Sequence, residues 1–406
     1  MTRGSYAENQ PQARPEVIVA GHICLDIVPQ MQTSDFSFRP GTLEQIGAPV
    51  VSLGGCVLNT GLALKKLGAS VHLAGKIGKD AIGDLLQIEL QKSGEAAEGL
   101  TRSSQDSTSY SIIISPRGAD RMILHFPGAN DSFSSGDVES ALSHVAEIFH
   151  FGYPPLMRRM FENDGRELEK IFRQAKQKDL LTSLDMAYPD PNSPASLVNW
   201  RAIAARVLPY VDVFLPSFEE LVCIFENEIP HAATSDCFRP NARVDTANVQ
   251  RLAETACKMG AGVVAIKLGS GGLYVRTSNE ARLRQAKKLL SENWVNRELW
   301  TPVFKVKVVG TTGAGDATVA GFLYGILRRF RIEEVCRLAC AVGACNVEAA
   351  DSISGILPFD LVQRRMQDGW EQESCPGGES WPAIVPGVFA GPSDGKPVTV
   401  SGVSND

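Results

Sequence analysis

A carboxylate that could serve as a base follows a run of small residues at 310–316, whose sequence is Gly-Thr-Thr-Gly-Ala-Gly-Asp. A β-branched run at 306–309 precedes it, and an amphipathic helical pattern follows. Small residues let the backbone approach a ligand closely, and the unpaired N–H groups at a helix start attract anions. The run therefore suits the charge on a phosphoryl group, with Asp316 placed to accept a hydroxyl proton. An aspartate that only caps the helix is the alternative interpretation.

Two earlier segments carry polar groups of a different kind. The double glycine Gly54-Gly55 opens a helical pattern with Asn59 in its first turn, and Asp26 stands just past the first predicted strand. Close backbone approach, an amide and a carboxylate suit a ligand with several hydroxyl groups. The alternative is a tight loop with Asn59 exposed or capping. We expect His22 to be packed or hydrogen-bonded rather than catalytic.

The elements that must position these groups alternate regularly along the chain. Short, nearly continuous apolar runs predict strands buried on both faces, at 17–21, 71–75, 148–152, 180–185, 211–216 and 263–269. Three- and four-residue spacing of apolar positions predicts helices at 56–67, 81–92, 165–178, 247–259, 316–329, 332–349 and 359–367. Such alternation predicts an α/β fold, a doubly wound and mostly parallel sheet flanked by helices. Ligands bind beyond the carboxyl ends of the strands in such sheets.

Several stretches break this rhythm. Residues 29–52 and 107–126 fit strands of a small antiparallel flap outside the main sheet. The stretches at 227–246 and 278–302 are predicted to be surface insertions. We expect residues 1–15 to be disordered and the Gly-, Pro- and Ser-rich tail at 367–406 to be loosely held or disordered.

Composition excludes several classes of partner. The net charge of −6 gives no electrostatic reason to expect nucleic acid or an anionic membrane. Nine cysteines, an odd number with no Cys-x-x-Cys pair, indicate a reduced, cytoplasmic protein. The first residues lack the apolar segment of a secretory signal, and no apolar run is long enough to span a membrane.

Taken in order, these segments resemble the ribokinase-like (PfkB) carbohydrate kinase family over roughly residues 16–366. The motifs that carry the resemblance are Gly21-x-x-x-x-Asp26, Gly54-Gly55-x-x-x-Asn59, Gly75-x-x-Gly78-x-Asp80-x-x-Gly83 and Gly313-Ala314-Gly315-Asp316. Their order along the chain is more specific than any one of them.

The resemblance implies a kinase domain with a small β lid, formed by the stretches at 29–52 and 107–126. It implies transfer of the γ-phosphoryl group of ATP to a hydroxymethyl group of a sugar or related alcohol. Asp316 would be the general base, and the backbone of Gly313, Ala314 and Gly315 would form the anion hole. The substrate would be held by Asp26, Gly54, Gly55 and Asn59.

On the nucleotide side, the resemblance assigns Glu220 to Mg²⁺ and its waters. It assigns to ATP the positions Lys267, Gly269, Gly272, Thr312 and Asn346. The chain departs from the family pattern at Gly310, where the family usually has an aspartate that helps to bind a monovalent cation. It also has Ser217 where the family has asparagine, and 351–355 differs from the usual Gly-Ala segment. An activating potassium site is therefore in doubt.

The sequence leaves three alternatives open. The acceptor could be a nucleoside instead of a sugar, because the geometry of the lid and of residues 125–130 decides this. A catalytically silent member of the family, acting as a regulator, is the second. The third concerns assembly, since an exposed lid edge could pair two copies into a homodimer.

Overall fold

The computed structural model describes residues 14–31, 40–41, 43, 45–94, 97–114, 122–226, 245–286, 289–375 and 380–396. The extension predicted at 1–15 and the insertion predicted at 227–246 therefore fall almost wholly outside the described residues. Within the described part of the chain, no helix has both the length and the apolar character needed to cross a bilayer.

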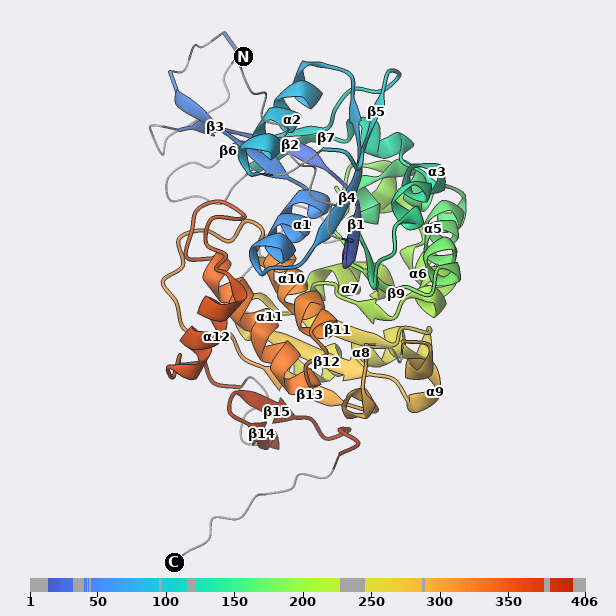
Figure 1. Cartoon of the computed structure of the whole chain (residues 1–406), viewed down its shortest axis with the longest axis vertical. Helices are drawn as coiled ribbons and strands as arrows, with labels where there is room; N and C mark the ends of the chain where they lie inside the picture. The colour runs from blue at the N-terminus through green and yellow to red at the C-terminus, as the bar shows by residue number, and fades with distance from the viewer. Residues whose placement is uncertain are drawn as a thin grey trace, which may run out of the picture.

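A large sheet forms the body of the molecule (Figure 1). Its parallel part has the order β5-β4-β1-β8-β9-β10-β11. The strands are β1 (Val17–Gly21), β4 (Val71–Gly78), β5 (Leu100–Ser103), β8 (Ile148–Gly152), β9 (Leu181–Leu184), β10 (Val213–Phe214) and β11 (Val263–Lys267). Antiparallel strands then extend it beyond β11, in the order β12 (Leu273–Thr277), β13 (Glu298–Thr301), β15 (Val388–Ala390) and β14 (Ala383–Val385). The predicted, mostly parallel sheet is confirmed.

Helices cover both faces of this sheet, which explains the nearly continuous apolar strands. In β1, Val17 and Val19 belong to one hydrophobic core, and Ile18 and Ala20 belong to the other. The first core takes side chains from α1 (Cys56–Lys66), α2 (Ala81–Lys92), α9 (Glu280–Leu283), α10 (Ala314–Leu327), α11 (Ile332–Asn346) and α12 (Phe359–Gln367). The second takes them from α3 (Ser135–Glu139), α4 (Arg158–Phe161), α5 (Arg166–Gln177), α6 (Trp200–Val207), α7 (Phe218–Glu226) and α8 (Thr246–Lys258).

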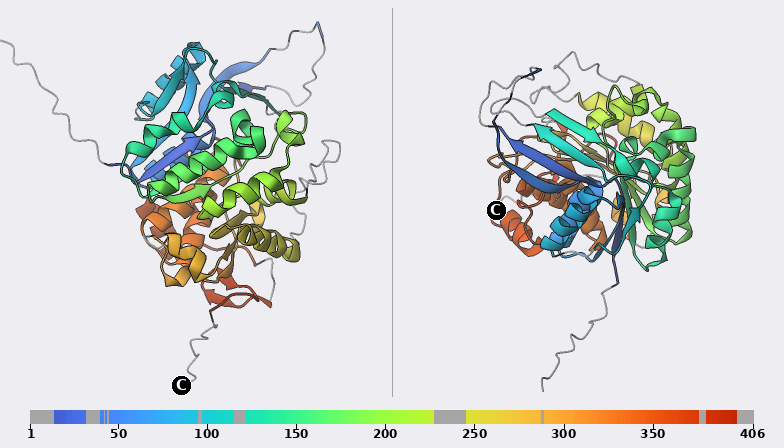
Figure 2. Two further views of the ribbon diagram at one scale, coloured as in Figure 1. Left: turned by 90° about the vertical axis from the view of Figure 1, so that its right-hand side faces the viewer. Right: turned by 90° about the horizontal axis from the view of Figure 1, so that it is seen from above.

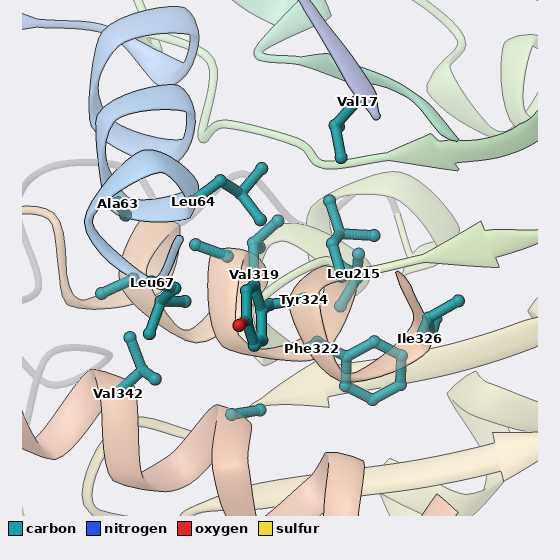
Figure 3. Packing of buried hydrophobic residues seen from close by; sticks show 14 of the residues in the cluster. Val17, Ala63, Leu64, Leu67, Leu215, Val319, Phe322, Tyr324, Ile326 and Val342 are labelled. Carbon is teal, nitrogen blue, oxygen red and sulfur yellow. The ribbon is translucent and has the colours of Figure 1, made fainter. Parts of the chain in front are cut away.

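The packing of α1 against α10 brings distant parts of the sequence together. Leu64 of α1 and Leu67 just after it lie beside Val319 of α10 in the first core (Figure 3). The helix α11 lies against α10 on its other side, where Gly321 leaves no room for a Cβ, since one would lie 2.9 Å from the Cα of Ala339. Both helices that carry the predicted motifs are thus held by buried apolar contacts, at roughly 25 cal/mol per Å² of apolar surface removed from water.

A second sheet of four strands lies apart from the main one (Figure 2). Its order is β3-β2-β6-β7, with β2 (Cys24–Gln30), β3 (Gly47–Gly54), β6 (Tyr110–Ile114) and β7 (Met122–Phe126). Within the described residues, both stretches predicted to form a flap therefore contribute strands to one separate sheet, although β2 begins before residue 29. The pairing of β2 with β6 is parallel, so this sheet is not wholly antiparallel as expected.

The prediction of a surface insertion at 278–302 is wrong for its second half. Strand β13 pairs with β12, and Trp294 and Trp300 are fully buried. The buried guanidinium of Arg297 forms ion pairs with Glu333 and Asp394. Trp294 belongs to the first core, which α11 also lines, and Trp300 belongs to the second core, which a surface loop could not achieve.

The expectation of a loosely held tail is also wrong for residues 380–396. Strand β15 pairs with β13, and Trp381 packs edge-on against Trp300. The carboxylate of Asp394 accepts a bond of 2.8 Å from Arg297 Nε. Glycine and proline here shape turns between strands instead of preventing order. We call residues 380–396 the C-terminal strap.

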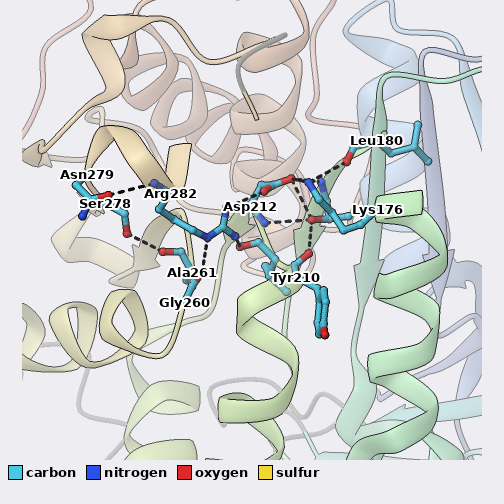
Figure 4. A network of polar contacts seen from close by, with 11 residues as sticks. Lys176, Leu180, Tyr210, Asp212, Gly260, Ala261, Ser278, Asn279 and Arg282 are labelled. Carbon is cyan, nitrogen blue, oxygen red and sulfur yellow. Dashed lines mark hydrogen bonds and ion pairs between the residues drawn. The ribbon is translucent and has the colours of Figure 1, made fainter. Parts of the chain in front are cut away.

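A buried ion-pair network lies at the amino ends of the strands (Figure 4). The carboxylate of Asp212, just before β10, lies 2.7 Å from Lys176 Nζ and 3.1 Å from an Arg282 guanidinium nitrogen. It also accepts a bond of 3.0 Å from the backbone N–H of Thr182. Each oxygen of this buried carboxylate therefore has a cationic partner.

Candidate active site

The start of α10 carries the predicted base. Gly313 precedes the helix in a left-handed conformation (φ 74°), and a Cβ at this position would lie 2.5 Å from the Cβ of Ser352. Only glycine adopts this positive φ readily and also avoids the clash of a Cβ with Ser352. No described side chain caps the helix, and the N–H of Ala314 donates to the carbonyl of Thr311 at 3.3 Å. The first N–H groups of a helix have no partner within it and attract anions, so the anion hole expected from the backbone of Gly313, Ala314 and Gly315 stays a prediction.

Asp316 lies in the first turn of α10 and is only 3% exposed. Its carboxylate accepts a bond of 3.0 Å from Asn59 Nδ2 and one of 3.3 Å from Thr60 Oγ1. The hydroxyl of Tyr153 lies 2.7 and 2.8 Å from its two oxygens. Burial raises the pKa of Asp316, while these donors and the charge of Lys267 hold it down. The structure thus joins Asp316 to Asn59 of the second predicted segment.

The substrate side of the site contains unused acceptors. Asn59 Oδ1 is buried and has no hydrogen-bond partner among the described residues. Gly54 lies against Asp26 so closely that a Cβ there would overlap its carboxylate. Burial raises the pKa of Cys24, and the nearby charges of Asp26 and Asp316 raise it further. Asp26, Asn59 and Asp316 therefore belong to one region.

A buried lysine lies on the other side of Gly315. Lys267, at the end of β11, has its Nζ 3.7 Å from where a Cβ of Gly315 would stand. The same Nζ lies 2.5 Å from Asp185 Oδ1, just past β9, whereas Asp185 Oδ2 has no partner among the described residues. Burial raises the pKa of Asp185 to about 7 against the pull of Lys267. An ammonium group thus lies beside the start of α10.

Glu220 has a structural bond as well as a place near this lysine. Its carboxylate accepts a bond of 2.6 Å from the N–H of Ser217, and Ser217 Oγ accepts one of 3.2 Å from the N–H of Glu220. This is a capping box at the start of α7. Burial raises the pKa of Glu220, and the charge of Lys267 lowers it. No described group of three or more His, Cys, Asp and Glu side chains could hold a metal ion by itself.

Other predicted nucleotide residues have mainly structural surroundings. Asn346 Nδ2 donates a bond of 2.7 Å to the carbonyl of Ser352, which fastens the loop that packs on Gly313. Gly272 lies against the carbonyl of Thr301, where a Cβ would overlap it. Gly269 is exposed at the turn after β11, and Thr312 lies on the loop before α10. The structure does not bring these four into contact with Asp316.

The loop at Gly310 is closed by backbone contacts. The N–H of Gly310 donates to the carbonyl of Val347 at 3.2 Å. A Cβ at 310 would lie 2.8 Å from the carbonyl oxygen of Ala349. An aspartate side chain has no room at this position as the backbone stands.

The junction between the two sheets holds a pair of histidines. His22 Nε2 and His125 Nε2 lie 3.3 Å apart, and His125 Nδ1 lies 3.2 Å from Ser111 Oγ. Burial lowers the pKa of both imidazoles. His22 is therefore hydrogen-bonded and buried, as predicted. At the same junction Asn130 bonds both the N–H and the carbonyl of Ile23.

Sequence reasoning missed three residues of this site, which are Tyr153, Asp185 and Thr60. Tyr153 and Asp185 are the first residues with polar side chains after β8 and β9. The rule that ligands bind beyond the carboxyl ends of parallel strands could have identified both. Nothing in the sequence pairs Thr60 with Asp316, because 256 residues separate them.

The sequence of the chain is similar to those of several known proteins. Residues 14–359 match the model of the pfkB family carbohydrate kinase. An uncharacterized sugar kinase of Archaeoglobus fulgidus is 26% identical over 295 residues, which cover 73% of this chain and 98% of that protein. Fructokinase-2 of Solanum lycopersicum is 23% identical over 352 residues, 84% of this chain and 92% of that one.

A solved structure shares the fold. Ribokinase of Arabidopsis thaliana, complexed with ribose and ATP, superimposes with a TM-score of 0.65 at 18% sequence identity. The match covers 87% of this chain and 98% of that one. The ribokinase-like fold expected from the sequence is confirmed.

Proposed function

The chain belongs to the pfkB family of carbohydrate kinases, and from this premise we propose that it phosphorylates a hydroxymethyl group of a sugar or sugar-like alcohol with ATP, using Asp316 as general base. One observation carries the proposal. Asp316 is buried at the uncapped start of α10 and is held by Asn59 from the opposite half of the chain. A base, an anion-binding helix end and a polar substrate wall therefore converge at one point.

In the proposed reaction, the acceptor hydroxyl gives its proton to Asp316 and its oxygen attacks the γ-phosphorus of ATP. The bond between the γ-phosphorus and the bridging oxygen breaks, and ADP leaves with the electron pair. The N–H groups at the start of α10 and the ammonium of Lys267 balance the charge on the transferring group. Positioning supplies much of the rate, so Asp316 needs no extreme pKa.

Magnesium fits the nucleotide side as a companion of the phosphates. Hard cations prefer oxygen ligands, and Mg²⁺ usually keeps several waters and few protein ligands. Asp185 Oδ2, which is buried without a partner, and the carboxylate of Glu220 are suitable donors near Lys267. When bound, Mg²⁺ would neutralise part of the charge of the phosphates. Glu220 and Asp185 would hold the ion directly or through water.

The choice of acceptor rests on the relatives. Proteins named as a sugar kinase and a fructokinase match most of this chain, and a ribokinase bound to ribose and ATP shares the fold. A nucleoside kinase of Methanocaldococcus jannaschii has the same fold at a TM-score of 0.61. We therefore propose a sugar first and a nucleoside as the second candidate.

The direct test is a screen for ADP release with sugars, sugar phosphates and nucleosides as acceptors. We expect turnover with a sugar and a loss of about 10²- to 10⁴-fold in kcat for Asp316→Asn. Asp360, an exposed aspartate in the first turn of α12, provides the matched control Asp360→Asn, which leaves kcat unchanged. Activity that survives Asp316→Asn contradicts the assignment of the base. Clean ATP binding without turnover on any acceptor supports the catalytically silent alternative.

Assembly and compartment complete the proposal. β7 is an edge strand with Ile123 and Leu124 about half exposed, so a second copy could pair there as a homodimer. Light scattering at increasing concentration measures this, and Ile123→Lys should keep the protein monomeric. None of the eight cysteines that the structure describes is in a disulfide, which fits the cytoplasm.

A further inference from the structure

We propose that Tyr153 is a positioning residue that keeps Asp316 ionised and fixes the plane of its carboxylate for proton transfer. This inference rests on the proposed role of Asp316 as the base. The hydroxyl of Tyr153 lies 2.7 Å from Asp316 Oδ1 and 2.8 Å from Oδ2. One O–H hydrogen is shared between both oxygens, so the carboxylate cannot rotate without losing a bond.

The backbone at Tyr153 supports the same conclusion. Tyr153 has a left-handed conformation, with φ 66° and ψ 42°. This conformation costs a non-glycine residue energy and persists where the surroundings enforce it, most often at functional sites. Pro154 and Pro155 follow at once and begin a short 3₁₀ turn. The strained residue therefore turns the side chain from the end of β8 toward α10.

The hydroxyl of Tyr153 remains a donor at working pH. Burial raises the pKa of this phenol well above its usual value, and the nearby charge of Asp316 raises it further. Asn59 Nδ2 and Thr60 Oγ1 reach Asp316 from one helix, α1, while Tyr153 reaches it from the position just after β8. Removing Tyr153 leaves the carboxylate buried with its two donors from α1.

Other groups also face Asp316 and must stay constant in a test. The ammonium of Lys267 from β11 favours the carboxylate, whereas the charge of Asp185 opposes it. The thiols of Cys56 from α1 and Cys24 from β2 lie near, and burial keeps both protonated by raising their pKa values. None of these groups changes when Tyr153 loses only its hydroxyl.

The test compares two substitutions that remove the same atom. Tyr153→Phe removes the donor to Asp316, and Tyr274→Phe removes a hydroxyl that donates at 2.8 Å to the buried carboxylate of Glu298, at the far part of the sheet. Hydrogen bonds to a charged group favour its charged form. We expect Tyr153→Phe to lower kcat/KM at pH 6 by about tenfold or more, and to approach the wild-type value at pH 9. Tyr274→Phe should follow the wild-type pH profile. A profile for Tyr153→Phe that superimposes on the wild type overturns the proposal.

A second measurement needs no substrate. Without its Tyr153 donor, ionised Asp316 is less stable in the fold, so Tyr153→Phe should lower the Tm more at pH 9 than at pH 5. The same substitution in an Asp316→Asn background should lose this pH dependence. A Tm difference that does not change with pH, or that persists in the Asn background, contradicts the coupling. If no acceptor is phosphorylated, the proposed function fails. The comparison of Tm values in the wild-type and Asp316→Asn backgrounds still tests whether Tyr153 stabilises ionised Asp316.

Discussion

Two buried aspartates at opposite ends of adjacent strands have very different surroundings. Asp212, just before β10, has Lys176 on one oxygen and Arg282 on the other (Figure 4). Asp185, just after β9, has Lys267 on one oxygen and no described partner on the other. Both carboxylates are about equally hidden from solvent, at 0% and 1% exposed.

The difference lies in how far the fold itself satisfies each buried carboxylate. A buried carboxylate with two cations and backbone donors is satisfied and ties three elements together. A buried acceptor left without a partner costs free energy in the folded protein. Such a cost is tolerated where a ligand supplies the partner, and Asp185 lies at the carboxyl ends of the strands, beside the proposed phosphate site.

The largest expected effect is a loss of stability on substitution of Asp212, at the amino ends of the strands. Asp212→Asn leaves Lys176 and Arg282 without their common counter-charge, and should lower the free energy of unfolding by about 3–5 kcal/mol. The activity per folded molecule should not change. Denaturant unfolding and kinetics on the folded fraction measure both. A loss of kcat without loss of stability would contradict a purely structural role for Asp212.

The next effect is on activity at the carboxyl end. Lys267→Met removes the ammonium beside Gly315 and should lower kcat by about 10²- to 10³-fold, because a donor to the transferring group is lost. Its matched control is Lys176→Met, which removes an ammonium from Asp212 and should leave kcat unchanged. Equal kcat values for the two variants would rule out the phosphate role of Lys267.

The pH dependence of stability sharpens the comparison further. The pKa of Asp185 is raised to about 7 by burial, so the unfolded chain releases this proton first as pH rises. The wild type therefore loses stability from Asp185 between pH 4 and 7. Asp185→Asn lacks this loss, so its stability relative to wild type should rise from pH 5 to pH 8, by up to about 1.4 kcal/mol per pH unit. A flat difference across this range would show that Asp185 is satisfied like Asp212.

The smallest effect concerns monovalent cations. The backbone at 349 closes the space beside Gly310, so a carboxylate side chain at this position has no room. We expect replacement of Na⁺ by K⁺ to change kcat by less than about twofold, since no charged ligand is lost or gained. Activation by tenfold or more would show that backbone carbonyls alone build a cation site there.

Much of this fold was readable in the sequence, because buried strands and amphipathic helices leave periodic patterns. The helices predicted at 81–92 and 359–367 match α2 and α12. Motif order also joined Asn59 to Asp316 before any geometry. The polar partners of Asp316 were harder to predict. Tyr153 is 163 residues away in the sequence and reaches Asp316 through an unusual backbone conformation. No local pattern encodes such a contact.

The C-terminal strap could not be predicted from the sequence, for a different reason. Its strands are three residues each and are surrounded by glycine and proline. The pairing of β15 with β13 and the ion pair between Arg297 and Asp394 hold this segment against the main sheet. Both partners lie nearly 100 residues earlier in the chain, so composition alone suggested disorder.

The C-terminal strap also covers an edge of the main sheet that could otherwise pair with another chain. Without residues 380–396, β13 would be the last strand of the main sheet, with its backbone groups open and Trp300 beside them. An open edge of this kind is a template for pairing with another chain. The strap replaces it with β14, a three-residue strand that lies between Pro382 and Pro386 and offers few free backbone groups. Residues 380–396 thus cover the edge at β13, which stays open in the growing chain until they have been synthesised.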